Sequence, residues 1–169
     1  KELLAAIEAG FTTVSIEMEA VRLRSALGEG MRLAGEVNKY LDQSAPWQKV
    51  KTDKAAAGRS IFTALRAIDS IKILLAPFLP FTSEQLHQYM GYDTQLFGDQ
   101  FVQTITDSLG ERKALRYDGS KAAGRWEPSQ LAPGHTLRPP KPLYRKLEPS
   151  IIEEERQRLY RLALMKDAA

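Results

Sequence analysis

Two long helical patterns joined by a short link constrain the fold of this chain more than any other feature. Apolar residues recur at three- and four-residue steps through residues 12–43 and again through residues 53–79. The link, residues 44–52, contains Pro46, which cannot extend a helix. Two long amphipathic helices with so short a link pack as an antiparallel hairpin. The sequence therefore predicts a helix bundle with Trp47 at the tip of this hairpin.

Local signals set the expected limits of these helices. Glycines weaken the first pattern, each by about 1 kcal/mol relative to alanine, and allow a bend or break near Gly28-Glu29-Gly30. Asp53 can cap the second helix, and Pro77 and Pro80 end or kink it. Residues 1–92 are thus expected to supply the core helices of the bundle.

A short third helix is expected over residues 83–90. Thr82 and Gln85 have the spacing of a capping box, and Gly91 follows as a stop signal. Beyond it, residues 93–125 are expected to form an insertion. The four-residue spacing of Phe101, Ile105 and Leu109 predicts a helix over 99–109 within it, and a flexible basic loop is expected to follow that helix.

The last segment, 126–169, begins with a proline-rich stretch up to residue 149, which predicts an extended strap. The strap must be held by packing, and its large apolar side chains are the candidate anchors: Trp126, Leu131, Leu137, Leu143 and Tyr144. Ser150 and Glu153 predict a capping box for a final helix over 151–165 that packs back on the bundle. The expected fold class is all-α.

Composition narrows the possible functions. Cysteine is absent and His87 and His135 are the only imidazoles, which excludes disulfides and argues against a zinc site. No glycine-rich phosphate loop or catalytic constellation is present, and no apolar run is long enough to span a membrane. Residue 1 is Lys1, within a helical pattern, so we expect a fragment of a longer protein, and the absence of cysteine favours a cytoplasmic one.

Charge is distributed unevenly. The net charge is +3, but residues 112–146 hold nine Lys or Arg against two acidic residues, so this segment is +7 and the rest of the chain is −4. Such a segment suits nucleic acid, and it equally suits a solvated basic loop.

The hairpin tip combines an aromatic ring with positive charge. Lys49, Lys51 and Lys54 follow Trp47 closely. Unpaired RNA bases stack on aromatic rings for roughly 1–3 kcal/mol each, while lysines neutralise phosphates. The alternative is that Trp47 folds back and closes the end of the bundle as a hydrophobic plug.

Three blocks of sequence carry a family resemblance. Asn38-Lys39-Tyr40-Leu41 followed by Ala45-Pro46-Trp47 resembles the anticodon-binding domain of methionyl-tRNA synthetases (methionine–tRNA ligases), which are class I aminoacyl-tRNA synthetases. Residues 75–84 are similar to the proline-broken helix end of that family. Trp126 with residues 131–137 and 140–147 is similar to its closing segment. Synthetases for valine, isoleucine and leucine share the bundle but match the first block less well.

The resemblance implies a helix bundle that reads the CAU anticodon of methionine tRNA, the initiator tRNA included. It implies that Trp47 stacks on an anticodon base. Lys49, Lys51 and Lys54 beside the ring are the expected phosphate contacts, and Asn38, Tyr40 and Pro46 are expected to support the turn. It places methionylation, with ATP and magnesium, in a catalytic domain of the same protein outside this chain, so no cofactor is expected here.

The family also uses an asparagine and an arginine on a first bundle helix, which would precede Lys1. Loss of that helix should expose apolar surface, so we expect poor solubility of the fragment or its self-association through that face. Two other interpretations stay open on sequence grounds: the anticodon-binding domain of a valine-, isoleucine- or leucine-type synthetase, and a helical module that binds protein through Trp47.

Overall fold

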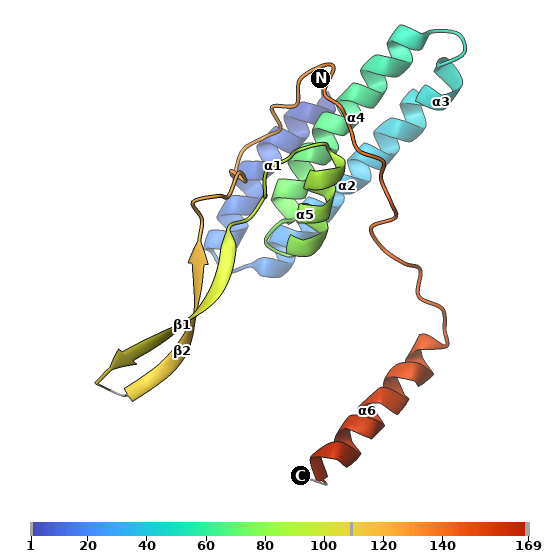
Figure 1. Ribbon diagram of the computed structural model, residues 1–169. Coiled ribbons are helices and arrows are strands. Elements are labelled where there is room, and N and C mark those ends of the chain that lie inside the picture. Colours follow the sequence, from blue (N-terminus) through green and yellow to red (C-terminus); the bar gives the residue numbers. More distant parts are fainter. Residues whose placement is uncertain (1, 109, 168–169) are drawn as a thin grey trace.

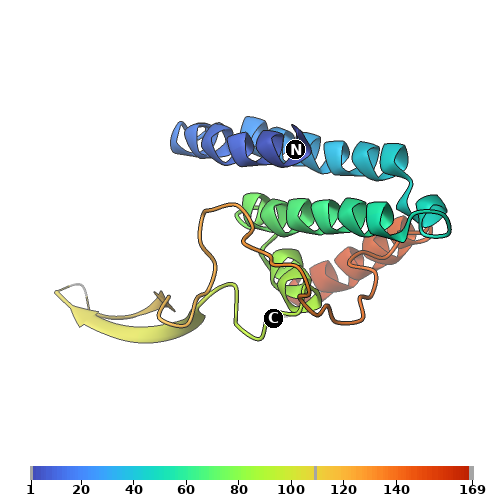
Figure 2. The same ribbon diagram turned by 90° about the horizontal axis from the view of Figure 1, so that it is seen from above.

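Three long helices carry the core in the computed structural model, which describes residues 2–108 and 110–167 (Figure 1). The elements in chain order are α1 (Glu2–Glu19), α2 (Leu23–Ser44), α3 (Pro46–Lys49), α4 (Lys54–Leu75), α5 (Pro80–Tyr89), β1 (Asp99–Asp107), β2 (Gly110–Asp118) and α6 (Ile151–Asp167). Figure 2 shows α1 and α2 as one layer, α4 as the next, and α5 beyond α4. The predicted helical hairpin is the α2–α3–α4 unit.

The core lies where α1, α2 and α4 meet. Ile7, Val14, Leu33 and Leu74 are fully buried there. Each such side chain contributes roughly 1.5–3 kcal/mol relative to an exposed one. A Cβ on Gly10 would lie 2.4 Å from the Leu33 Cδ1 atom, so the absence of a side chain at this position allows α1 and α2 to approach closely.

The first long pattern is two helices rather than one. The chain reverses at residues 20–22, where Val21 has a φ of +57°, and α2 begins at Leu23. The expected break near Gly28–Gly30 is wrong, because both glycines lie inside α2. A Cβ at Gly30 would lie 2.8 Å from the Leu75 Cδ2 atom, so this glycine serves close packing against α4.

The second long helix of the predicted hairpin, α4, agrees better with the capping and proline signals in its sequence. The Ala56 backbone N–H donates to the Asp53 Oδ1 atom at 2.8 Å, which confirms the predicted cap. The helix ends at Leu75, and α5 begins at Pro80, earlier than predicted. The predicted Thr82–Gln85 capping box is wrong, since proline at the first helical position already begins α5.

An all-α fold is wrong for one segment. Residues 99–109 were expected to be helical, but β1 and β2 pair as an antiparallel hairpin from Asp99↔Asp118 to Asp107↔Gly110. β-Branched residues crowd β1, in the run Val102 to Thr106, and favour a strand. Leu109, which contributed to the helical spacing, lies outside the described residues. The status of 93–125 as an insertion stays a prediction.

Strand pairing also places acidic residues of β1 beside the first part of the basic segment. One cation of β2 and one just beyond the strand lie beside carboxylates of β1: Arg112 pairs with Asp107 at 2.6 Å, and Lys121 pairs with Asp99 at 2.9 Å. Residues 99–118 together hold three basic and four acidic residues, which gives −1. The hairpin itself is therefore not a basic surface.

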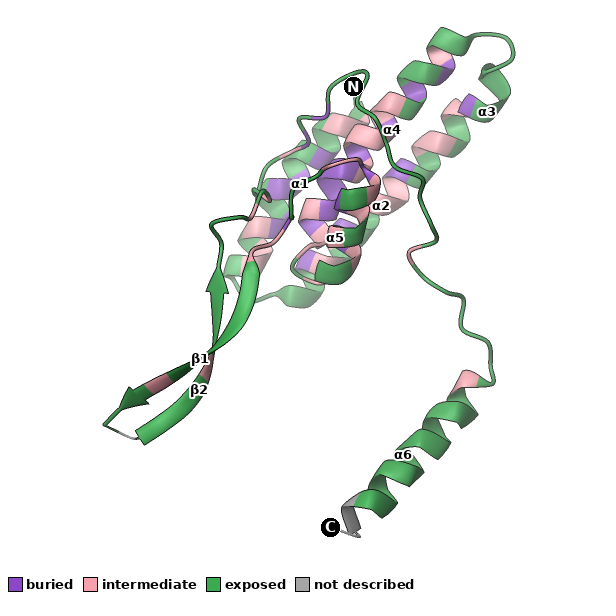
Figure 3. Ribbon diagram, in the orientation of Figure 1, coloured by how far each residue is buried: buried purple, intermediate pink, exposed green. Residues whose placement is uncertain are grey.

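The strap is anchored over its first half. Leu131 is buried, and the Trp126 ring contacts Phe11 edge-on at 5.5 Å between centroids. The final helix forms as predicted, but it does not pack back on the bundle: its described side chains are exposed except for half-buried Ile151 (Figure 3). Over the described parts of the chain, no helix has the length and apolarity needed to cross a bilayer.

Candidate nucleic-acid interface

The tip of the hairpin is a sharp turn built around one proline. α2 ends when Ala45 enters the left-handed region, with φ +38° and ψ 58°, and its N–H donates to the Leu41 carbonyl at 2.9 Å. Pro46 is buried at the first position of α3. Its ring fixes φ near −65°, a value that suits a helix start. The two residues that precede Trp47 in the turn therefore both have a constrained backbone conformation.

Trp47 is exposed at this turn. Its side chain has 55% of its surface accessible, although tryptophan is usually well buried. The alternative in which Trp47 plugs the end of the bundle is therefore wrong for this conformation. The buried residue at the turn is its neighbour, Pro46. An exposed indole next to a buried proline is accessible to a ligand.

The three lysines expected beside Trp47 are all exposed on α3, the following turn and the start of α4. None of Lys49, Lys51 and Lys54 forms an ion pair with another residue of the described chain. Their ammonium groups are free to meet phosphates.

Asn38 and Tyr40 lie near the end of α2 but face different cavities. Tyr40 is half-buried, packs against the core, and lines a cleft of about 410 Å³ between α1 and α2. Asn38 is exposed and lines a groove between α2, α4 and α5. Support of the turn by these two side chains stays a prediction.

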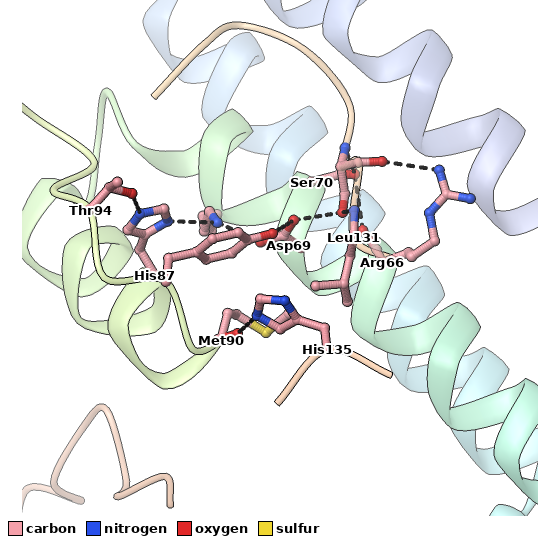
Figure 4. Close-up of polar contacts among 11 residues, drawn as sticks. Arg66, Asp69, Ser70, His87, Met90, Thr94, Leu131 and His135 are labelled. Atoms are coloured by element: carbon pink, nitrogen blue, oxygen red, sulfur yellow. Dashed lines mark hydrogen bonds and ion pairs between the residues drawn. The ribbon is translucent and has the colours of Figure 1, made fainter. Parts of the chain in front are cut away.

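A second polar site, not expected from the sequence, is buried between α4 and α5. Lys72 donates to the Asp69 Oδ1 atom at 2.5 Å and lies 3.0 Å from His87 Nδ1 (Figure 4). Because an ammonium can only donate, His87 Nδ1 accepts and its proton is on Nε2, 3.1 Å from the Thr94 hydroxyl. Lys72 and Asp69 are 4% and 5% exposed, so this is a buried ion pair.

The same carboxylate holds the strap. The Ser129 and Tyr92 hydroxyls donate to Asp69 Oδ2 at 2.6 Å and 2.9 Å. The Ser129 N–H donates to the Ser70 hydroxyl at 2.9 Å, and the Leu131 N–H donates to the Ser129 hydroxyl at 3.1 Å. Burial raises the pKa of Tyr92, and the Asp69 carboxylate raises it further. The network thus joins α4 to residues about sixty positions later.

We expect this network to make the stability of the fold sensitive to acid. Burial lowers the pKa of His87, and the neighbouring Lys72 ammonium lowers it further. The stability contributed by the neutral ring is fully present above the unfolded pKa of about 6.5 and is lost as the pH falls toward the lower, folded value. We expect urea unfolding at pH 7, 6 and 5 to show a decline of at most about 1.4 kcal/mol per pH unit from this group.

His87→Gln should flatten this pH dependence even if the variant is less stable throughout. Glu84, Asp69, Lys72 and Tyr92 surround the ring and stay unchanged in that variant. An equally steep decline in His87→Gln would assign the acid sensitivity to other groups.

Neither site has the composition of a catalytic or metal centre. Within residues 2–108 and 110–167, no group of three or more His, Cys, Asp or Glu residues is placed to hold a metal ion. The network's polar groups are bonded to one another, whereas the tip presents an exposed ring and exposed cations. The tip is therefore the candidate for binding, and the network is structural.

Comparisons with known proteins agree on one family. A family model described as the anticodon-binding domain of methionyl-tRNA ligase matches residues 1–119. The methionine–tRNA ligase of Thermomicrobium roseum is 52% identical over 93% of this chain. Those of Chloroflexus aggregans and Thermobifida fusca are 41% and 34% identical, each over 94% of it. The chain spans about 27% of the length of each of these relatives.

Proposed function

This chain belongs to the family of methionyl-tRNA ligase anticodon-binding domains, and we propose that it binds the CAU anticodon loop of methionine tRNAs, initiator tRNA included, through the tip at Trp47. The observation that carries this proposal is the 55% exposed indole on a turn with Pro46 buried at its start, with three exposed lysines beside it. A ring and nearby cations are what an unstacked base and its phosphates require.

The family match also bears on the alternatives. The matching model and the relatives named above are of methionine type, which argues against a valine-, isoleucine- or leucine-type domain. A protein-binding scaffold would not require the lysines beside the ring. These considerations favour RNA as the ligand of the tip.

Removal of the ring should weaken RNA binding strongly. We expect Trp47→Ala to reduce the affinity for a CAU anticodon stem-loop by roughly 5- to 150-fold, from the loss of one stacked base worth about 1–3 kcal/mol. Fluorescence anisotropy with a labelled stem-loop measures this, and a stem-loop with a GAC anticodon tests whether the methionine sequence is preferred.

Phe81→Ala is the matched control, because Phe81 is an 89% exposed aromatic residue on α5, away from the tip. It should leave RNA affinity unchanged. Equal affinity in Trp47→Ala and the unsubstituted chain would contradict the stacking role.

The lysines should act through charge. Replacing Lys49, Lys51 and Lys54 by glutamine is expected to reduce the slope of log K against log salt by about 2, since each phosphate contact to a single strand contributes about 0.7. Titrations between 50 and 300 mM salt would measure the change. Lys113→Gln on the hairpin is the control. If it reduced the slope of log K against log salt by as much as each tip lysine does, the result would contradict a patch of phosphate contacts centred on Trp47.

For the full-length protein we propose the activity that its relatives' name states, the ligation of methionine to tRNA. ATP and magnesium would act in a catalytic domain of the same protein, outside the residues described here, and the part of the chain that the structure describes offers no metal site of its own. In this arrangement the chain positions the tRNA for that domain. The expected cytoplasmic location stays a prediction.

A further inference from the structure

Part of the basic segment 112–146 keeps its positive charge in the folded chain. Of its nine cations, Arg112, Lys121 and Arg138 pair with carboxylates, and the Arg125 guanidinium donates to two backbone carbonyls. Another group lies in the second half of the strap, is exposed, and forms no ion pair with any residue of 2–108 or 110–167: Lys141, Arg145 and Lys146.

Two hydrogen bonds place this half of the strap along α5. The Arg138 backbone N–H donates to the Tyr89 carbonyl at 3.0 Å, where α5 ends. The Tyr144 hydroxyl donates to the Thr82 hydroxyl at 2.9 Å, near the start of the same helix. The strap therefore runs antiparallel to α5, and half-buried Leu143 lines the apolar groove between α2, α4 and α5.

Prolines stiffen the strap between these two hydrogen bonds. Pro139, Pro140 and Pro142 each have a φ angle fixed by the ring, and Lys141 is restricted to extended conformations because it precedes a proline. A backbone with few accessible conformations loses little entropy when its side chains bind a ligand. The strap thus presents positive charge from a backbone that is already ordered on the bundle.

The strap crosses the same face of α4 that begins at the tip. Lys54 starts this helix, and Ile61 and Ile68 follow at seven-residue steps, which repeat one face of a helix. Ile68 lines the groove together with Leu143 of the strap, and Ile61 between the two is 45% exposed. At 1.5 Å per residue, Lys54 and Ile68 are about 21 Å apart along the helix axis. The only acidic residue of α4 is Asp69, which is buried, so this face carries no exposed carboxylate of α4.

The strap suits paired RNA better than unpaired RNA. Residues 138–147 contain four basic residues and no acidic one, so no carboxylate among them repels a phosphate. Their one aromatic residue, Tyr144, is tied to Thr82 through its hydroxyl. Bases of a duplex stack on one another, and proteins recognise such RNA mainly through its shape, its phosphates and its 2′-hydroxyls. Cations without a free stacking ring match that requirement.

We propose that Lys141, Arg145 and Lys146 contact phosphates of the anticodon stem while the tip holds the loop of the same tRNA. This rests on the proposed function, because the stem lies beside the strap only when its loop is bound at Trp47. Phosphates are common to every stem, so these contacts position the RNA and do not read its sequence. The strap therefore contributes affinity for tRNA and leaves the choice among anticodons to the tip.

Two RNA ligands separate the strap from the tip: a CAU anticodon stem-loop, and an unpaired oligonucleotide with the sequence of the loop alone. The strap variant carries Lys141→Gln, Arg145→Gln and Lys146→Gln. For the stem-loop it should reduce the slope of log K against log salt by about 2–3, since each phosphate contact to a duplex contributes about 0.9. For the unpaired oligonucleotide the slope should not change. Trp47→Ala should weaken the binding of both RNAs.

The matched control carries Arg24→Gln, Lys113→Gln and Arg116→Gln, which remove the same charge from exposed positions on α2 and β2. It should leave both slopes unchanged. An unchanged stem-loop slope in the strap variant would overturn the proposal, and so would an equal reduction in the control variant. A reduction as large for the unpaired oligonucleotide would overturn the assignment to the paired stem. Full binding of both RNAs by Trp47→Ala would instead contradict the role of the tip, so the two proposals fail by different results.

Discussion

Asp69→Ala should cost about 3–5 kcal/mol of folding free energy, among the largest effects of any single substitution in this chain. Asp69 accepts hydrogen bonds from Lys72, Tyr92 and Ser129 in a site where its side chain is 5% exposed. Its removal leaves the Lys72 ammonium buried without a counter-charge and the two hydroxyls without their acceptor. Urea unfolding at pH 7 measures the loss.

A matched pair elsewhere isolates the effect of burial. Glu29 and Arg32 form an ion pair with the same i,i+3 spacing at 2.7 Å, but the arginine side chain is 53% exposed. Glu29→Ala should change stability by less than about 1 kcal/mol. Asp69→Ala with Lys72→Met should recover part of the loss by removing the stranded charge. A similar small loss for Asp69→Ala and Glu29→Ala would show that burial does not amplify the first pair.

Gly91→Ala is the second substitution expected to have a large effect. Gly91 has a φ of +90°, and an added Cβ would lie 2.0 Å from the backbone oxygen of Thr136 in the strap. The strap would have to move, and the His135 ring, which donates from Nε2 to the Met90 carbonyl at 2.6 Å, lies beside the same point. We expect a loss of about 2–5 kcal/mol, from backbone strain plus overpacking.

Gly134→Ala separates these two causes. Gly134 has a φ of +85° but no atom within 4 Å of an added Cβ, so it carries the strain without the clash and should lose only about 1–2 kcal/mol. Thermal and urea unfolding of both variants measure the difference. Equal losses of folding free energy in the two variants would mean that the strap moves away from the added Cβ near Thr136 without a free-energy penalty.

Signals confined to one element predicted the fold best. The Asp53 cap, the break at Pro46 and the apolar periods of α2 and α4 all act within a few residues, and the helical hairpin followed from them. The turn between α1 and α2 was not predicted, because Val21 adopts a positive φ. β-Branched residues rarely adopt this conformation, so a valine does not indicate a turn. The hairpin was missed because both of its strands are almost wholly exposed, so no buried alternation marks them.

In the two polar sites as well, residues that are close in sequence were predictable, whereas residues that meet only in the folded chain were not. Trp47 and its lysines are neighbours in sequence, and their position at the hairpin tip was predictable from the link. The exposure of Trp47 was not, because a buried position at the end of the bundle was equally open on sequence grounds. The buried network was not, because Asp69 and Ser129 are 60 residues apart and meet only when the strap crosses α4. One signal was available: Asp69 and Lys72 are charged residues inside an apolar helix that is buried on several sides.

The short helix α3 has a consequence for how a ligand would be held. Ala45 is in the left-handed region and Pro46 is buried with its φ fixed by the ring, so few backbone conformations remain for the turn that carries Trp47. The platform is thus preorganised: a stacking base orders little more than its own atoms, and most of the conformational entropy has already been lost. Substitutions that loosen this turn, rather than the ring, should shorten the lifetime of the complex while leaving the contacts of the bound state unchanged.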